Sequence, residues 1–375
     1  MTAGSTIELH YLLEGPEDAP VVVLANSLGT TLRVWDDQAS ALQARLLRYD
    51  HRGHGGSPVP PGPYKIEDLG RDLLALLDRL GLERVSFCGI SIGGMVGMWL
   101  ASEAPERVER MVLCCTSARL GPPEMWSERA AKVRANGVAE IAGTVLERWF
   151  TPAFRESRPE VVERAARMLL GTPAEGYAGC CEAIRDMDLR GRLGEIRAPT
   201  LVIAGADDPA IPLDNAELIR DSVPDARLVV IPRAAHLANV EQPETVTQAI
   251  LAHLVPVRGM RIRREVLGDD YVDAAVARTT GFTADFQDLI TRYAWGEIWT
   301  RPGLDRRTRS AITLTALMAQ GRLEELEIHV RAALRNGLSA DEIKEVLLHN
   351  AIYCGVPAAN SAFAVAQRVL AERDG

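Results

Sequence analysis

The sequence lacks any apolar run long enough to cross a membrane as a helix, which takes about 18 consecutive residues. Residues 1–10 have neither the basic start nor the apolar core of a secretory signal peptide. We therefore expect a cytoplasmic protein that does not bind membranes.

Cysteine is sparse and is not spaced for a metal site. The six cysteines are Cys88, Cys114, Cys115, Cys180, Cys181 and Cys354. None of them forms C-x-x-C, and Cys88 and Cys114 lie in apolar, strand-like runs. This pattern predicts reduced, mostly buried thiols, with neither a zinc site nor a disulfide framework.

Basic residues are in the minority. The sequence has 42 Lys and Arg and 51 Asp and Glu, which gives a net charge of -9. This balance argues against a nucleic-acid-binding surface. It does not exclude an acidic small-molecule substrate, because a binding site needs only local positive charge. The length of 375 residues and the hydrophobic content of 47% are typical of a soluble globular protein with two domains.

Residues 1–255 read as an α/β domain. Strands are expected over 7–13, 21–25, 44–49, 84–88, 111–115, 200–204 and 227–231, and helices over 69–80, 95–101 and 243–254. Alternating strands and helices predict a mostly parallel sheet. Residues 118–188, approximately, have helical patterns and no strand-like run, so we expect them to form a helical lid above the strand ends.

The most informative motif is Gly89-Ile90-Ser91-Ile92-Gly93, a G-x-S-x-G between an expected strand and an expected helix. In this context the motif indicates a nucleophile elbow, which exposes a serine on a sharp turn. The elbow requires small residues two positions before and after the serine, and both are glycine here.

A serine nucleophile needs a base and an acid that orients the base, and in α/β-hydrolases they follow in the order Ser, Asp or Glu, His. His236 follows the last expected strand, and Asp207 and Asp208 follow the strand before it. The spacing from Gly205 favours Asp208. His51 and His54 follow the wrong strand for a base and are interpreted as loop-packing residues.

The oxyanion hole is expected to use two backbone N–H groups, those of Ile92 and Leu28. On the lid, Trp126 and Arg129 are candidates for binding an acidic substrate, with lid packing as the alternative for Trp126.

Residues 256–262 are basic and contain Pro and Gly, and are predicted to be a linker. Residues 263–375 read as an all-α domain. Asp305 is a predicted N-cap, and Ser339 with Glu342 forms a capping box.

In this second domain Glu325 and His329 are spaced i and i+4, so their side chains can meet on one helix face. Such a pair can keep the imidazole protonated or orient it for acid catalysis. Glu345 and His349 repeat the spacing, and we favour the first pair. Arg306 and Arg309 are candidates for binding a carboxylate, with a solvated helix start as the alternative.

The first domain resembles 3-oxoadipate enol-lactonases over about residues 5–254. The similarity lies in the segments at 26–30, 50–57, 89–94 and 235–241, which read NSLGT, DHRGHGGS, GISIGG and AHLANVE. Single motifs of this set are shared with esterases, haloperoxidases and dehalogenases.

The second domain resembles carboxymuconolactone decarboxylases over about residues 263–373, on the segments 305–310, 325–337 and 353–359. Redox-active members of the wider superfamily have a C-x-x-C before the histidine. Arg322 and Glu325 occupy those positions here, so we set the redox interpretation aside.

Together the resemblances imply a bifunctional enzyme of protocatechuate catabolism, in the β-ketoadipate pathway. The second domain would decarboxylate 4-carboxymuconolactone, and the first would hydrolyse the resulting enol-lactone to 3-oxoadipate. No cofactor is expected, because the electrons left by CO₂ can delocalise through the alkene onto the lactone carbonyl. Homo-oligomerisation through the helical domain is also implied. The alternatives are a general serine esterase with a non-catalytic helical oligomerisation domain, and a non-enzymatic binding module.

Overall fold

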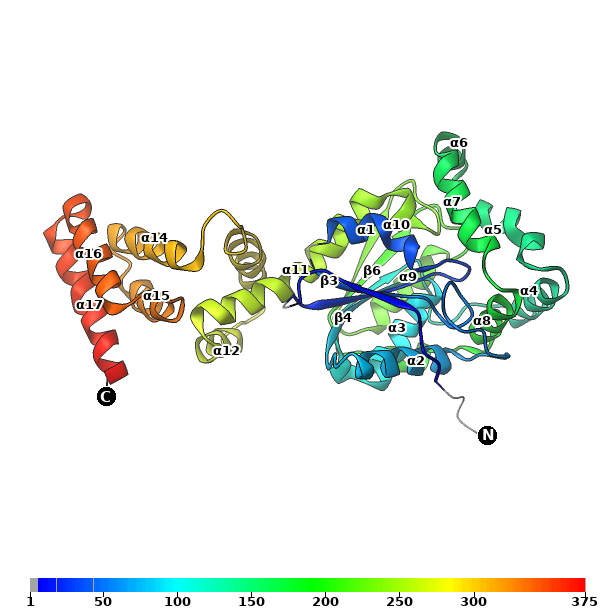
Figure 1. The fold of residues 1–375 in the computed structure, drawn as a ribbon, viewed down its shortest axis with the longest axis horizontal. Helices are drawn as coiled ribbons and strands as arrows, with labels where there is room; N and C mark the ends of the chain where they lie inside the picture. Colours follow the sequence, from blue (N-terminus) through cyan, green and yellow to red (C-terminus); the bar gives the residue numbers. More distant parts are fainter. Residues whose placement is uncertain (1–5, 18, 43, 375) are drawn as a thin grey trace. The chain divides into compact units, whose positions relative to one another are not determined.

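A computed structural model describes residues 6–17, 19–42 and 44–374 (Figure 1). The chain forms two compact units, 1–254 and 255–375. None of the helices within the described residues is both long and apolar enough to span a lipid bilayer.

The first unit is built on one seven-stranded sheet with the order β1-β3-β2-β4-β5-β6-β7. Its strands are β1 (Tyr11–Glu14), β2 (Val21–Ala25), β3 (Arg45–Tyr49), β4 (Val85–Ile90), β5 (Val108–Cys114), β6 (Thr200–Gly205) and β7 (Ala226–Ile231). All neighbouring pairs are parallel except β1–β3 at the edge. The central strands β2, β4 and β6 are buried along their whole length, as the continuous apolar runs of a parallel sheet require.

Helices cover both faces of the sheet. Those outside the lid are α1 (Asp36–Ala41), α2 (Ile66–Arg79), α3 (Ile92–Glu103), α9 (Leu213–Ser222), α10 (Ala238–Glu241) and α11 (Pro243–Leu267), with the short helices η1 (Leu32–Trp35), η2 (Pro105–Arg107) and η4 (Arg190–Glu195). Figure 1 shows α2 and α3 on one face and α1 and α10 on the other. The side chain of Gln38 in α1 donates to Asn239 O and Thr247 Oγ1, which ties α1 to α10 and α11.

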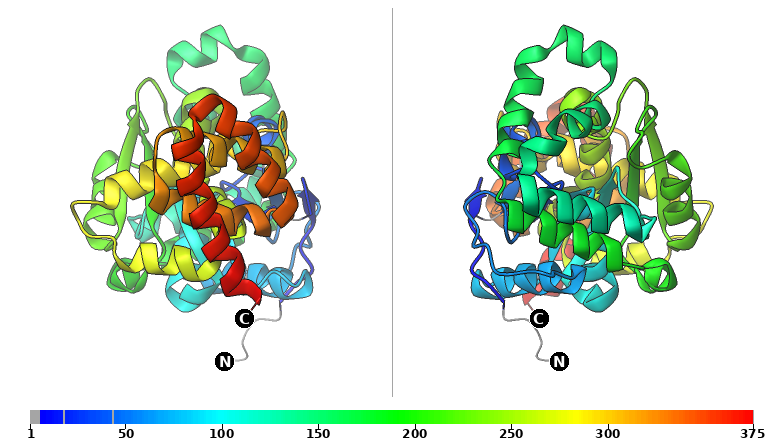
Figure 2. Two further views of the ribbon diagram at one scale, coloured as in Figure 1. Left: turned by 90° about the vertical axis from the view of Figure 1, so that its left-hand side faces the viewer. Right: turned by 90° about the vertical axis from the view of Figure 1, so that its right-hand side faces the viewer.

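The segment between β5 and η4 is helical. It contains α4 (Pro123–Asn136), η3 (Val138–Ile141), α5 (Ala142–Trp149), α6 (Pro152–Ser157), α7 (Pro159–Leu170) and α8 (Ala174–Asp186), which we call the lid. Figure 2 shows these green helices gathered on one side of the first unit. The lid packs on the loops that follow β2 and β3. An added Cβ on Gly29 would lie 2.7 Å from Leu169, and one on Gly53 would lie 2.3 Å from the Gly176 Cα.

The second unit is all-α after α11. It contains α12 (Asp269–Ala277), α13 (Ala284–Ile290), the π-helix η5 (Thr291–Ile298), α14 (Arg306–Ala319), α15 (Leu323–Arg335), α16 (Ala340–Cys354) and α17 (Val356–Asp374). Asp305 caps α14 by accepting from Thr308 N, and Ser339 and Glu342 form a capping box on α16. Two apolar clusters, one on α14 to α17 and one joining α11, α12, η5 and α15, form its core.

Two sequence predictions were wrong. Residues 256–262 are not a linker but lie within α11, because Ile262 and Val266, one turn apart, are buried in the second unit's core. The first strand begins at Tyr11 rather than at residue 7, because the backbone N–H groups of Ile7 and His10 bond to the side chains of Asp72 and Ser57 instead of to a strand.

Candidate active sites

Ser91 lies at the turn between β4 and α3. Its backbone has φ 57° and ψ -120°, which is strained for a residue with a side chain. Ser91 N donates to Cys114 O at 2.9 Å, and its carbonyl accepts from Thr116 Oγ1 at 2.7 Å. An added Cβ on Gly89 or Gly93 would lie 2.4 Å from a carbonyl oxygen, so both positions require glycine. This is the geometry of a nucleophile elbow.

Asp208 and His236 are bonded to each other in the loops after β6 and β7. His236 Nδ1 lies 2.9 Å from Asp208 Oδ2. Asp208 Oδ1 accepts from the backbone N–H groups of Ala210 and Ile211 at 2.8 and 3.0 Å, which fixes the carboxylate. Asp208 and His236 are buried, whereas Asp207 is exposed. Because β4, β5, β6 and β7 are parallel neighbours, the loop residues Ser91, Asp208 and His236 lie at the same edge of the sheet.

A buried carboxylate that the sequence did not reveal supports the His236 loop. Glu241 accepts from Ala235 N at 2.8 Å and from Thr151 N at 3.2 Å. It also accepts from the Thr151 hydroxyl. Glu241 therefore joins the histidine loop to the lid between α5 and α6. Thr151 is distant from Glu241 in the chain, so only a folded structure identifies this link.

The loop after β2 lies beside the elbow. Gly93 N donates to Asn26 O at 3.0 Å, which holds the two turns together. Within the described residues, no loop or turn hydrogen bond uses the N–H groups of Leu28 or Ile92. The N–H of Ile92 is also the first of α3, where the helix dipole favours negative charge. Both groups are therefore available to an oxyanion.

His51 and His54 brace this loop. His51 Nε2 lies 3.1 Å from Asn26 O, and His54 Nε2 accepts from Gly29 N at 3.0 Å. Burial lowers the pKa of His51 to about 3 and also lowers the pKa of His54. Both imidazoles are therefore neutral at pH 7, and their role is to position the loop that contains Leu28.

The lid supplies one cation near this loop. The Arg129 guanidinium lies 5.3 Å from the Trp126 ring and 5.4 Å from the Tyr177 ring, and donates to the Tyr177 hydroxyl. Among the described residues no carboxylate pairs with Arg129, and its Nε is buried without an acceptor. Tyr177 also contacts the loop at Gly29, so it links Arg129 to the oxyanion loop. Trp126 is buried and donates from Nε1 to Leu120 O, which gives it a packing role as well.

In the second unit the two His/Glu pairs differ in environment. His329 is half-buried and Glu325 is exposed, whereas His349 and Glu345 are both exposed. The His349 ring lies at a tilt to the Tyr353 ring, with centroids 5.1 Å apart. Burial lowers the pKa of His329 below its ordinary value, although Glu325 acts in the opposite direction. The structure thus does not keep His329 protonated. Among the described residues, no hydrogen bond or ion pair joins Glu325 to His329, so Glu325 acts on the imidazole only through its negative charge.

Arg306 and Arg309 both have partners within the chain. Arg306 pairs with Glu265 of α11, and Arg309 donates to Arg301 O at 2.8 Å. Arg306 is therefore neutralised by a carboxylate, whereas no carboxylate of the described residues pairs with Arg309, whose Nε is buried without an acceptor.

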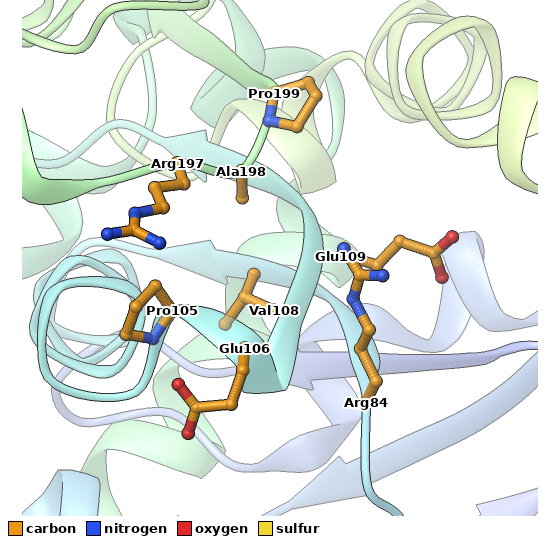
Figure 3. A pocket seen from close by; sticks show the side chains of 8 residues that line it. All are labelled: Arg84, Pro105, Glu106, Val108, Glu109, Arg197, Ala198 and Pro199. Atoms are coloured by element: carbon orange, nitrogen blue, oxygen red, sulfur yellow. The ribbon is translucent and has the colours of Figure 1, made fainter. Parts of the chain in front are cut away.

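The hollow drawn in Figure 3, of about 370 Å³, does not contain these residues. It lies at the amino ends of β4 to β6, the opposite edge of the sheet, and is lined by Arg84, Pro105, Glu106, Val108, Glu109, Arg197, Ala198 and Pro199. We assign it no chemistry. Among residues 6–17, 19–42 and 44–374, no group of three or more His, Cys, Asp or Glu is placed to hold a metal ion.

Comparison with known proteins separates the chain into the same two parts. Residues 20–243 match the family described as alpha/beta hydrolase fold, and residues 284–368 match the carboxymuconolactone decarboxylase family. The first part is 42% identical over 248 residues to 3-oxoadipate enol-lactonase 2 of Acinetobacter baylyi, covering 66% of this chain and 92% of the relative.

The second part is 46% identical over 112 residues to 4-carboxymuconolactone decarboxylase of the same organism, covering 30% of this chain and 84% of that protein. Among solved structures, the enol-lactonase from Burkholderia xenovorans is 42% identical, with a TM-score of 0.65, and the match covers 66% of this chain and 96% of that one.

Proposed function

Because the chain belongs to the alpha/beta hydrolase fold family over residues 20–243 and to the carboxymuconolactone decarboxylase family over residues 284–368, we propose that it is a bifunctional enzyme of the β-ketoadipate pathway. Its second unit decarboxylates 4-carboxymuconolactone to 3-oxoadipate enol-lactone, and its first unit hydrolyses that lactone to 3-oxoadipate. The main observation behind the hydrolytic half is the bonded Asp208–His236 pair at the sheet edge that also holds the strained Ser91 turn.

For the lactonase, we assign Ser91 as nucleophile, His236 as base and Asp208 as the residue that orients His236. Ser91 Oγ bonds to the lactone carbonyl carbon while its proton passes to His236 Nε2. The N–H groups of Leu28 and Ile92 stabilise the oxyanion. The ring C–O bond then breaks, and the enol oxygen takes the proton from His236. Water, deprotonated by His236, next attacks the acyl carbon, and the ester bond to Ser91 breaks as His236 returns the proton to Ser91 Oγ. Tautomerisation of the released enol gives 3-oxoadipate.

The lactone has a free carboxylate, for which Arg129 is the proposed partner. The charge of Arg129 is not neutralised by a carboxylate within the described chain. Trp126 and Tyr177 hold its guanidinium by cation–π contacts. Its contact with Tyr177 also links it to the oxyanion loop.

For the decarboxylase, the reaction requires stabilisation of a dienolate and delivery of a proton to carbon. We assign the proton transfer to His329, with Glu325 as the neighbouring negative charge. Because burial lowers the pKa of His329, the neutral imidazole would relay a proton from solvent to the carbon. His349 and Glu345 are the second choice because His349 is exposed whereas His329 is half-buried. Arg306 and Arg309 contribute positive charge at the start of α14. Arg306 also pairs with Glu265, and Arg309 donates to Arg301 O.

The proposal includes self-association through the second unit and a cytoplasmic location. Ile352, Tyr353 and Val356 are 81%, 75% and 65% exposed in the isolated chain. Exposed large apolar side chains close together in the chain, here at the end of α16 and the start of α17, are a feature of association surfaces. Sedimentation velocity of the parent and of Tyr353→Glu tests this part, with a smaller species expected for the variant.

The main test is proton NMR of 4-carboxymuconolactone mixed with the parent protein or with Ser91→Ala. The parent is expected to form 3-oxoadipate. Ser91→Ala is expected to accumulate the enol-lactone, because decarboxylation does not use Ser91 whereas hydrolysis does.

Persistence of carboxymuconolactone in both samples would refute the decarboxylase assignment. The remaining function would then be a general serine esterase with a helical oligomerisation domain. Labelling of Ser91 by a fluorophosphonate separates that enzyme from a non-enzymatic binding module.

A further inference from the structure

The second unit contains a buried arginine that differs from the other buried arginines of the described chain. Arg48, Arg52 and Arg263 are each 5% exposed. Arg52 donates from Nε and Nη2 to the two oxygens of Asp72, at 2.7 and 2.8 Å. Arg48 uses the same two nitrogens for Glu14. In both cases the Nε/Nη2 edge of the guanidinium holds a carboxylate.

Arg263 of α11 has no carboxylate on this edge. Its Nη1 donates to Gln287 Oε1 at 3.0 Å and to Thr291 Oγ1 at 3.4 Å. Its Nε is buried without an acceptor, and no described residue accepts from Nη2. A buried guanidinium keeps its charge, so an isolated one is unfavourable unless an anion accompanies it. Burial lowers the pKa of Arg263, and only the Tyr271 phenol acts in the other direction.

The surrounding backbone holds Arg263 in place. Gly259 lies one turn earlier on α11, and an added Cβ there would lie 2.0 Å from Thr291 O. The π-helix η5, which begins at Thr291, therefore packs directly on the α11 face that presents Arg263. π-helical turns are rare and occur frequently at functional sites.

The helices that contain Arg263 and the proposed acid His329 pack against each other through neighbouring apolar residues. Ile262, next to Arg263, and Ala332 of α15 are members of one buried cluster, and Ile328 packs against it. His329 directly follows Ile328 in α15. The two side chains thus project from helices that share one core.

We infer that the Nε/Nη2 edge of Arg263 binds a carboxylate of the acidic substrate of the second unit. The inference rests on the proposed decarboxylase function for the choice of substrate, whereas the anion-binding edge follows from the geometry alone. A fork of two parallel N–H groups matches a carboxylate in the way that Arg52 matches Asp72. Arg306, in contrast, is already paired with Glu265, and Arg309 is only partly buried and donates to Arg301 O.

The test compares Arg263→Met and Arg263→Lys with Arg264→Met as a matched control. Arg264 is the neighbouring arginine, but it pairs with Asp269 and Asp273. Three quantities are measured on the full chain: the thermal unfolding of the second unit, its shift on adding adipate as a stable dicarboxylate probe, and the KM and kcat for 4-carboxymuconolactone.

Arg263→Met is expected to raise the unfolding midpoint without ligand by a few degrees, because it removes a buried charge that lacks a counter-ion. It is also expected to abolish the adipate shift and to raise KM at least tenfold. Arg263→Lys keeps the charge but loses the fork, so its KM is expected to rise about tenfold. Arg264→Met is expected to retain the adipate shift and KM.

A purely structural role for Arg263 predicts the opposite sign, a lower unfolding midpoint with unchanged KM in the molecules that remain folded. That result, or an unchanged KM for Arg263→Lys, would overturn the inference. Should the parent not decarboxylate 4-carboxymuconolactone at all, the proposed function fails. An adipate shift that depends on Arg263 would still support the anion site in that case.

Discussion

At the scale of single residues, the hydrogen bonds of Asp208 determine which tautomer of His236 is present. Asp208 Oδ1 accepts hydrogen bonds from two backbone N–H groups. An asparagine at this position would therefore keep its oxygen toward those N–H groups and turn its NH₂ toward His236 Nδ1. Asp208→Asn would therefore favour the wrong tautomer. We expect kcat for lactone hydrolysis to fall by roughly 10³ to 10⁴, with decarboxylation unchanged.

The matched control is Asp207→Asn, at the neighbouring exposed carboxylate, which should retain kcat. Steady-state hydrolysis of the enol-lactone measures both variants. A large loss in Asp207→Asn with retention in Asp208→Asn would reverse the assignment of the acid.

His51, which supports the oxyanion loop, makes the stability of the first unit depend on pH. Its pKa is about 3 in the folded protein and near 6.5 when unfolded, so the unfolded chain binds more protons between these values. Its contribution to stability is complete above pH 6.5 and is lost as pH falls toward 3, by on the order of 2–3 kcal/mol between pH 6.5 and 4.5.

His51→Gln removes this titration while its amide N–H can still donate to Asn26 O. Denaturant unfolding of the first unit should therefore show a shallower decline below pH 6.5 in His51→Gln than in the parent. Equal slopes would mean that other groups, such as His54 and His253, account for the decline.

At the scale of secondary-structure elements, the contact between α8 and the loop after β3 sets the position of the lid. An added Cβ on Gly176 would lie 2.1 Å from Gly53 O. We expect Gly176→Ala to destabilise the first unit by about 1–3 kcal/mol, because the neighbour is rigid backbone. Lactonase kcat/KM should fall as well, since the displaced loop includes His54, which holds Gly29.

Gly143→Ala is the comparison for this variant. Gly143 lies near the start of another lid helix, α5, with open space around its Cα. Alanine there should be neutral or stabilising, because alanine has the higher helix propensity. Thermal melts and enol-lactone kinetics on both variants decide whether close packing or glycine content matters at Gly176.

Much of this element-scale structure was predictable from the sequence. Buried parallel strands read as apolar runs, and the Asp305 and Ser339 caps use only local contacts. The order of Ser91, Asp208 and His236 after strands of one parallel sheet was sufficient to propose the triad, and the structure places Asp208 and His236 in hydrogen-bond contact. The roles of Glu241, Tyr177 and Arg263 were not predictable, since each depends on partners brought close only by tertiary packing. Residues 256–262 were predicted to be a linker because they contain Pro and Gly. The burial of Ile262 and Val266, which makes this segment helical, depends on tertiary packing.

At the scale of the whole molecule, the two units have separate cores. The buried residues of the first cluster all precede residue 255, and those of the other two begin at Ile262. We expect calorimetry to resolve two unfolding transitions. Gly259→Ala should lower only one of them, because its Cβ would collide with Thr291 O within the second unit.

Enol-lactonase activity should survive in Gly259→Ala at temperatures where decarboxylation is lost. A single transition that shifts as a whole would instead show that the two units unfold cooperatively.

The presence of both units in one chain also has a consequence for metabolic flux. With both activities on one polypeptide, the cell holds the two sites in equal number whatever the level of expression. In the proposed sequence of reactions, the standing concentration of enol-lactone then depends on the rate constants of the two sites and not on the ratio of two gene products. If the supply of carboxymuconolactone per enzyme molecule stays the same, making more of the protein raises the flux through both steps. The concentration of the enol-lactone intermediate then does not change.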